Sequence, residues 1–395
     1  MKIRRLVREH MVLSSEDFKA GELVTHSQSC LWLCGESRLA EALLSFDSKG
    51  KRVDPHTAFA CRVLGIRYED FDKKIKKHSN GRQAAKPPNF GFPGGMGDYK
   101  LVLQQRKQGP DTPCEFGHSL VDDGTGTGNK VPGFKGLRFC VLMGAADRCG
   151  EVMRRTWGKR DYKITPTCLA CLECAQHLKR LWKEQWPENE AYFEFVQACV
   201  EHGMTITGEA LERWPWLKEV FYEGEQLAPG EIMQHVSGRI RNVATSTTES
   251  PFCSAANGFF QGLLADIAKE AHRICVRECY DSTVRVSDML FPNSIKSRYA
   301  GGGSPLLGSR IPVFQHDELI GEHPASVASD AAWRISEVMR DVMRWRCPDL
   351  ADAAEAEPTL MPAWYKGAER IDHRGRLAPW TPDHNPKTCV ECRAA

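Results

Sequence analysis

Apolar residues recur roughly every three to four positions along much of the chain, a spacing that is typical of amphipathic helices. This pattern predicts helices over the ranges 27–45, 55–64, 67–78, 168–184, 188–202, 255–280 and 326–345. Residues 82–86 also favour a helix, but Pro87-Pro88 lacks two backbone donors and predicts that the helix breaks or is distorted there. The chain is therefore expected to be mainly helical.

Strand patterns occur near both ends of the chain. Residues 9–14 predict a short strand that leads into the acidic turn Ser15-Glu16-Asp17, and residues 311–320 predict a strand, a turn and a second strand. Residues 108–136 and 240–251 are polar and predict loops, and the last residues predict a Pro-rich tail. Many helices with a few antiparallel strands indicate an α+β fold.

The bulk properties are those of a globular protein. A length of 395 residues predicts two or three compact units, and 42% apolar and 26% charged residues are ordinary values. The net charge of +2 supplies no overall field, so a nucleic-acid enzyme would have to concentrate Lys and Arg locally. Because no run of about 18 apolar residues occurs, no membrane span is expected.

The chain contains sixteen cysteines, and its N-terminus has no apolar segment of the kind found in secretory signals. We therefore expect reduced thiols and a cytoplasmic protein of a bacterium or a phage-infected host cell. Two clusters stand out, Cys168-x2-Cys171-x2-Cys174 with His177, and Cys389-x2-Cys392. Four thiolates from such pairs could hold a structural Zn²⁺. Three cysteines on one helix can equally be small core residues.

Acidic residues at strand ends are the main candidates for catalysis. Nucleotidyl transfer needs two divalent cations about 3.5–4 Å apart, bridged by carboxylates from distant parts of the chain. Asp17 and the pair Asp317-Glu318 fit that requirement, and hard oxygen ligands suit Mg²⁺. Taken singly, an Asp at a strand end is usually a solvated turn residue.

A basic segment lies between these acidic sites. Arg82, Lys86 and Phe90 are spaced at i, i+4 and i+8, so on a helix they would share one face. Two cations and an aromatic ring suit a triphosphate with its base. The alternative is a basic surface stripe followed by a core phenylalanine.

Together these segments resemble the motifs of the family A DNA polymerases, the family that includes DNA polymerase I. Asp17-Phe-Lys-Ala-Gly-Glu22 is similar to the first motif, Arg82-Gln-Ala-Ala-Lys86-Pro-Pro-Asn-Phe90 to the second, and Phe314-Gln-His316-Asp317-Glu318-Leu to the third. Two accessory matches, Asp54-Pro-His56-Thr and the segment from Asn257 to Lys269, lie in the expected order. The Phe-Pro-Gly-Gly after the second motif is similar to phage enzymes of this family.

The resemblance implies a right-hand polymerase fold, with an antiparallel palm sheet covered by helices and mainly helical fingers. Residues 1–55 and 246–395 would form the palm, and residues 56–245 would form the fingers, including an inserted helical region at about 105–245. The chain would then be a DNA-directed DNA polymerase, a nucleotidyltransferase that acts on primer–template DNA and deoxynucleoside triphosphates.

The resemblance also implies roles for single residues. Asp17, the Phe18 carbonyl and Asp317 would hold two Mg²⁺ ions, which Mn²⁺ could replace, with Glu318 beside them. The triphosphate would contact residues that match its binding positions in the family, namely His56, Arg82, Lys86 and Phe90. Lys86 would protonate the pyrophosphate, and Glu22 would exclude a 2′-hydroxyl.

Three further residues would contact DNA by the same resemblance. Asn257 and Gln261 lie one helical turn apart and would donate to minor-groove acceptors, which every base pair presents. The alternative is a polar face on a buried helix. His316 would approach the primer terminus, or it is a turn residue without a role.

The sequence departs from the family in several places. Gly94 replaces a tyrosine that normally packs on the gate glutamate, and Cys253 replaces an arginine. Only 16 residues precede Asp17, whereas the family places a thumb and often an exonuclease upstream. We therefore expect a fragment, a decayed gene, or one half of a split enzyme with a separate thumb or exonuclease chain. A non-catalytic DNA-binding subunit and a single-subunit RNA polymerase are the alternatives, although Glu22 and Glu318 favour DNA synthesis.

Overall fold

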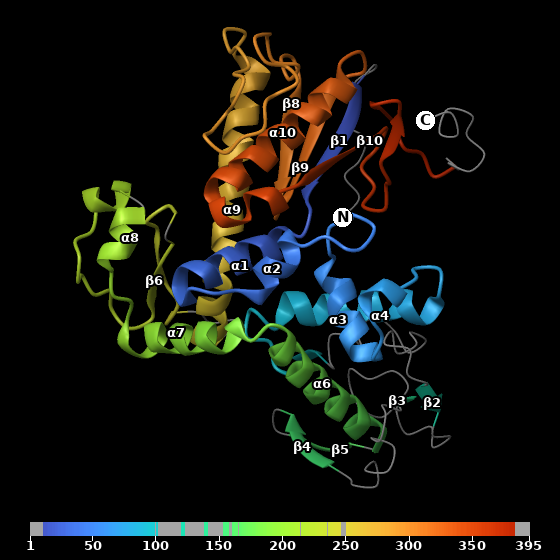
Figure 1. The fold of residues 1–395 in the computed structure, drawn as a ribbon, viewed down its shortest axis with the longest axis vertical. Helices are drawn as coiled ribbons and strands as arrows, with labels where there is room; N and C mark the ends of the chain where they lie inside the picture. The colour runs from blue at the N-terminus through green and yellow to red at the C-terminus, as the bar shows by residue number, and fades with distance from the viewer. Residues whose placement is uncertain are drawn as a thin grey trace. The chain divides into compact units, whose positions relative to one another are not determined.

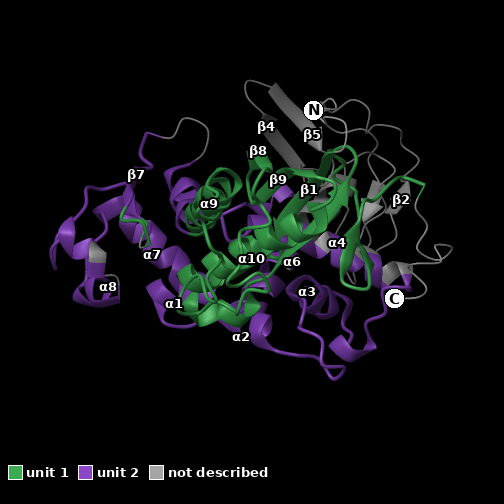
Figure 2. Cartoon of the chain, turned by 90° about the horizontal axis from the view of Figure 1, so that it is seen from above, with its two compact units in different colours: residues 1–28, 234–238, 260–395 green, residues 29–233, 239–259 purple. Residues whose placement is uncertain are grey.

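The chain divides into two compact units, which are coloured separately in Figure 2. The computed structural model describes residues 11–98, 100–101, 120–122, 138–140, 153–157, 160–164, 166–213, 215–234, 236–245 and 250–383. Unit 1 contains Met1–Gln28, Gln234–Gly238 and Phe260–Ala395, and unit 2 contains Ser29–Met233 and Arg239–Phe259. The compact units thus change over at residues 28 and 259, whereas the palm and fingers boundaries at 55 and 245 remain predictions.

Unit 1 is built on a four-stranded antiparallel sheet in the order β10-β1-β9-β8. The strands are β1 (Met11–Phe18), β8 (Arg310–Gln315), β9 (Glu318–Pro324) and β10 (Ala356–Met361). Strand β1 is central, so residues from the beginning of the chain pair with two strands from its last third. The fold therefore combines helices with an antiparallel sheet, as the pattern predicted.

Two predictions about this sheet were wrong. Ser15, Glu16 and Asp17 lie within β1 rather than in a turn, because both neighbouring strands pair with them. The predicted Pro-rich tail contains β10 and the hairpin of β11 (Ile371–His373) and β12 (Arg376–Ala378). Hydrogen bonds to β1 turn the first of these segments into a strand, and its own residues give little sign of it.

One face of the sheet in unit 1 is covered by α10 (Ala328–Arg346), which contacts β1, β9 and β10 (Figure 1). Val12 and Leu360 pack there against Ala328 and Ala332. Side chains alternate between the two faces of a strand. The side chains of β1 on the same face as Val12 therefore lie under α10, and Ser15 and Asp17 lie on the opposite face. The covering helix thus determines which face of β1 is free for chemistry.

Helix α9 (Pro251–Tyr280) is the longest element and passes from unit 2 into unit 1. Within unit 1, Phe260, Leu264 and Ile267 are buried as predicted, but Ile274 is only half-buried. In unit 1 a side chain at Gly21 would come within 3.1 Å of Leu264, so α9 and the start of α1 (Gly21–Cys34) pack closely. None of the described helices is long and apolar enough to cross a membrane.

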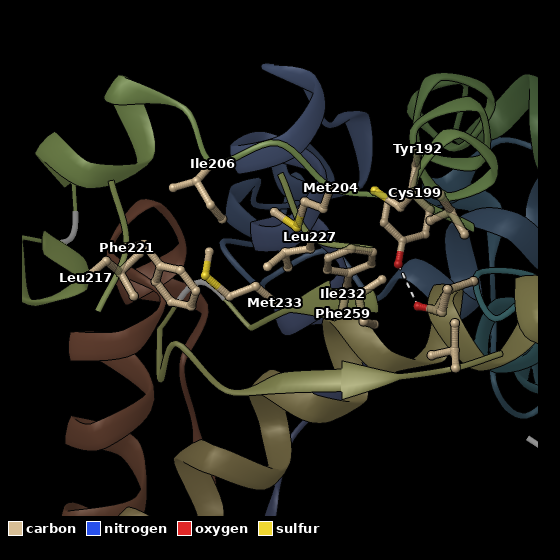
Figure 3. Packing of buried hydrophobic residues seen from close by; sticks show 14 of the residues in the cluster. Tyr192, Cys199, Met204, Ile206, Leu217, Phe221, Leu227, Ile232, Met233 and Phe259 are labelled. Atoms are coloured by element: carbon tan, nitrogen blue, oxygen red, sulfur yellow. Dashed lines mark hydrogen bonds between the residues drawn. The ribbon is translucent and has the colours of Figure 1, made fainter. Parts of the chain in front are cut away.

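Unit 2 is mainly helical. Its helices include α2 (Arg38–Leu44), α3 (Pro55–Leu64), α4 (Lys76–Gly91), α6 (Pro166–Gln185), α7 (Glu188–His202) and α8 (Gly208–Arg213). The predicted helices 55–64, 168–184 and 188–202 are confirmed. In the core drawn in Figure 3, the hydroxyl of buried Tyr192 donates to the carbonyl of Ala256 at 2.6 Å and ties α7 to the first turns of α9.

Short hairpins complete unit 2. The strands pair as β2 (Leu120–Asp122) with β3 (Arg138–Cys140), β4 (Met153–Trp157) with β5 (Arg160–Ile164), and β6 (Glu231–Met233) with β7 (Ile240–Asn242). Strand β7 and the start of α9 occupy the predicted connector 240–251, and most of the predicted loop 108–136 lies outside the described residues. The side chains of the zinc candidates Cys168, Cys171, Cys174, His177, Cys389 and Cys392 also lie outside them.

Three helix predictions were wrong. The range 27–45 holds two helices, because Gly35 has a left-handed φ of 80° and Ser37 caps α2 by accepting from the Ala40 amide. The range 67–78 contains only the 3-10 turn Tyr68–Asp70 and the start of α4.

The third error is the break at Pro87-Pro88, since α4 continues to Gly91. The two prolines lie in its last turns, where each lacks the amide that would donate to the carbonyl four residues earlier, so the helix continues despite two missing backbone bonds. Packing against α3 holds the helix, and buried Asn89 donates to the carbonyl of Pro55 at 3.4 Å. Tertiary contacts therefore outweigh the local preference.

Candidate active site

Asp17 and Asp317 lie at one end of the sheet in unit 1. Asp17 is the next-to-last residue of β1 and is paired in register with Glu318, the first residue of β9. Asp317 directly precedes Glu318 in the turn between β8 and β9. The sheet therefore gathers the three carboxylates that the sequence analysis selected.

The turn that carries Asp317 is a two-residue hairpin loop formed by His316 and Asp317, since Gln315 pairs with Glu318. His316 has a positive φ of 58°, which costs a non-glycine residue conformational energy. The pairing of β8 with β9 fixes this conformation. His316 and Asp317 are consequently held at defined positions beside the end of β1.

The carboxylates in unit 1 repel one another. Partial desolvation and the charges of Asp317 and Glu318 raise the pKa of Asp17 to about 7, although Asp17 as a residue remains exposed. Desolvation also raises the pKa of Asp317, with a further contribution from Glu318 and an opposing one from His316. The group is poised to gain from a bound cation, which would relieve this repulsion.

Glu22 joins the same group from the first turn of α1. Its pKa is raised by desolvation and by the negative charge of Asp317, and lowered by a hydrogen bond from Gln261. The Gln261 amide donates to Oε1 of Glu22 at 3.3 Å. The predicted gate residue and a predicted minor-groove residue thus contact each other directly.

Residues of the predicted tail also reach this site, which the sequence analysis missed. The indole of Trp364, three residues after β10, donates to Glu318 at 3.3 Å. Lys366 lies near enough to lower the pKa values of Asp17 and Asp317, against the larger effect of desolvation. A lone Trp or Lys in a Pro-rich segment carries no signal of this placement.

The predicted triphosphate residues are gathered in unit 2. Arg82 on α4 forms an ion pair with Asp54, Nε to Oδ2 at 2.5 Å, and Asp54 also caps α3 by accepting from the His56 amide at 3.2 Å. Burial alone would raise the pKa of Asp54, but bonds from Thr57 and Arg82 bring it below its usual value. Asp54 therefore holds the guanidinium of Arg82 in a fixed position.

His56 and Phe90 form the neighbouring part of this group. Their rings meet edge to face with centroids 4.9 Å apart, and the His56 Nδ1 lies 3.1 Å from the Asn89 amide. Burial lowers the pKa of His56 to about 4, assisted by the positive charges of Arg82 and Lys86. His56 is consequently neutral near pH 7 and can serve a phosphate only as a hydrogen-bond donor.

Gly94 and Asn257 lie in close contact in unit 2. The amide of Asn257 on α9 donates to the carbonyl of Gly94 at 3.5 Å, within unit 2. A Cβ atom on Gly94 would lie only 2.1 Å from the Oδ1 of Asn257. A side chain at this position would require the Asn257 side chain to move, and in unit 1 Glu22 is bonded to Gln261.

The donor set of unit 1 fits a magnesium site with few protein ligands. In the described parts of the chain, no three His, Cys, Asp or Glu side chains are arranged to hold a metal ion. Asp17 and Asp317 are two hard carboxylates that repel each other, and Mg²⁺ typically uses one or two carboxylates together with waters and substrate phosphates. The residues present therefore fit Mg²⁺ bound together with a nucleotide.

Comparison with solved structures finds resemblances, one of which is to a polymerase domain. The chain is similar to the "POL domain of Pol1 from M. smegmatis complex with DNA primer-template and dNTP", with a TM-score of 0.46 and 15% sequence identity. The match covers 91% of this chain and 41% of the mycobacterial chain, so this chain spans less than half the length of that protein. No family model and no curated protein matches.

Proposed function

We propose that the chain is a template-directed DNA polymerase of the family A type, with unit 1 as its palm. The observation that carries the proposal is the position of Asp17 and Asp317. Asp17 lies near the end of β1 on the sheet face opposite α10, and Asp317 directly precedes the adjacent strand β9, whose first residue Glu318 is paired with Asp17. Such a pair of carboxylates is the arrangement that two-metal nucleotidyl transfer requires.

Asp17, Asp317 and the backbone carbonyl of Phe18 would hold two Mg²⁺ ions, or Mn²⁺ in their place. When bound, the ions lower the pKa of the primer 3′-hydroxyl and neutralise charge on the triphosphate. The protein's own contribution is a rigid support, because β1 is bonded on both sides and the Asp317 turn is only two residues long. A fixed arrangement of charges needs little reorganisation during the reaction.

Glu22 would select the sugar in the same site. Its carboxylate is tethered by Gln261 and stands at the N-terminus of α1, so it cannot swing away freely. A side chain held there can leave no room for a 2′-hydroxyl, the group that distinguishes ribonucleotides. His316, at the hairpin loop, would contact the primer terminus.

The residues of unit 2 would bind the incoming nucleotide. Arg82 and Lys86 supply positive charge for the phosphates, neutral His56 supplies a donor, and Phe90 supplies a ring for the base. Lys86 would also protonate the pyrophosphate as it leaves. The ion pair with Asp54 is a feature that supports this role, since it orients Arg82 before the nucleotide arrives.

Primer extension by the full chain with Mg²⁺ tests the proposal. The wild-type chain should extend a primer on a DNA template, and Asp317→Ala should lower the rate by at least about 100-fold. Asp288→Ala is the matched control, because Asp288 is an exposed aspartate of unit 1 outside the site. If a thumb-bearing partner chain is required, adding it should restore extension to the wild type and not to Asp317→Ala. Equal rates for the wild type and Asp317→Ala would refute the proposal.

A further inference from the structure

Glu318 is held by two side chains from different segments of unit 1. The hydroxyl of Ser15 on β1 donates to Oε1 of Glu318 at 2.5 Å. The indole nitrogen of Trp364, in the segment after β10, donates to the same oxygen at 3.3 Å. One carboxylate oxygen thus accepts two hydrogen bonds, while Oε2 accepts none from the described residues.

These contacts follow from the order of the strands. Ser15 and Asp17 are two residues apart on β1, so both lie on the sheet face that α10 leaves free. Strand β10 lies on the far side of β1 from β9, yet Trp364 reaches across to Glu318 at the start of β9. The bond therefore links the segment after β10 to the start of β9, across the strand β1 that contains Asp17.

We propose that Ser15 and Trp364 are positioning residues of the polymerase site, which hold Glu318 in place beside Asp17 and Asp317. With Oε1 fixed by two donors, the carboxylate keeps one orientation and leaves Oε2 available to the cation site. Hydrogen bonds to groups around a metal site commonly change metal affinity or activity by 10–100-fold when they are removed. The inference rests on the proposed function, and it assigns part of the site to a segment that the sequence predicted to be a tail.

The surroundings of Trp364 support a role in the site more than a role in the core. Trp364 is only half-buried and is followed by exposed Tyr365 and Lys366. Lys366, two residues after Trp364, acts electrostatically on both aspartates, so this segment also brings a positive charge near them. Trp182 and Trp186 of unit 2, by contrast, are fully buried.

Two substitutions remove the donors singly. Trp364→Phe keeps the aromatic ring without its N–H, and Ser15→Ala removes the hydroxyl. Each should lower kcat for single-nucleotide addition by about tenfold and weaken Mn²⁺ binding, measured by electron paramagnetic resonance, by a similar factor. The KM for the nucleotide should change less than about twofold, because neither residue contacts it.

Matched controls separate positioning from a general loss of structure. Trp380→Phe removes an indole N–H from the same segment, and Ser309→Ala removes a buried hydroxyl that has no partner among the described residues. Both should keep wild-type kcat and Mn²⁺ affinity. Ser15→Thr should restore what Ser15→Ala loses, since it retains the donor. Thermal unfolding identifies any variant that fails to fold. If one of Trp364→Phe and Ser15→Ala fails to fold, the kcat and Mn²⁺ affinity of the other variant test the inference.

The possible results point to different conclusions. Wild-type Mn²⁺ affinity and kcat in both Trp364→Phe and Ser15→Ala would overturn the inference and leave the proposed function intact. A wild-type chain that neither binds Mn²⁺ nor extends a primer would overturn the proposed function and, with it, the inference. Tenfold losses in both variants, with unchanged controls, would establish Ser15 and Trp364 as positioning residues.

Discussion

Replacing Asp17 with asparagine should affect stability and activity in opposite directions. In the metal-free chain, desolvation and the charges of Asp317 and Glu318 raise the pKa of Asp17 from its usual 3.8 to about 7. Between these pH values the folded chain binds the proton more tightly than the unfolded chain, so the free energy of unfolding falls as the pH rises. Asparagine keeps the shape of the side chain but never carries this charge.

The size of the effect is limited by solvent. This rise in the pKa of Asp17 corresponds to at most about 4 kcal/mol in the free energy of unfolding. Asp17 is exposed, so water and salt screen the repulsion, and about 1 kcal/mol is a realistic gain for Asp17→Asn at pH 8. For a domain of 150–250 residues this raises Tm by roughly 2–4 °C. At pH 5 the gain should be smaller.

Thermal unfolding in EDTA at pH 5 and pH 8 measures this difference, and primer extension with Mg²⁺ measures activity. Asp17→Asn should unfold at a higher temperature at pH 8 and lose at least about 100-fold in extension rate. Glu357→Gln is the control, because Glu357 lies opposite Asp17 on β10 but forms an ion pair with Lys19. Its loss should not stabilise the chain. Lower stability of Asp17→Asn at pH 8 would refute the reasoning.

Three further substitutions test other parts of the site. Glu22→Ala should raise ribonucleotide incorporation at least about tenfold, measured by competition between ribo- and deoxynucleotides, and unchanged selectivity would remove Glu22 from the gate. Gly94→Ala should lower the free energy of unfolding by about 1–3 kcal/mol in urea, whereas Gly97→Ala, with open space around it, should not; equal stability would contradict the close contact with Asn257. Arg82→Ala should raise the KM for the nucleotide about tenfold in single-insertion kinetics, while Arg62→Ala, which loses only an exposed ion pair, should not.

The sequence by itself predicted the features that depend on neighbouring residues. The helices 55–64, 168–184 and 188–202 follow from apolar spacing and are found as α3, α6 and α7. The hairpin around Asp317 follows from two short strands with a turn between them. Asp17 and Asp317 were paired by their order in the resemblance to a family, and the sheet places them at the same end of adjacent strands.

Only the tertiary structure decided the features that depend on distant residues. Strand β10 exists because β1 offers it hydrogen bonds, and its own composition predicted a tail. Helix α4 passes through Pro87 and Pro88 because α3 packs against it, and a Cβ atom at Gly94 would meet the side chain of Asn257. The contact of Trp364 with Glu318 likewise joins residues that are adjacent only in the folded sheet. Periodicity records which side of an element is buried, but the partner that buries it is fixed by long-range packing.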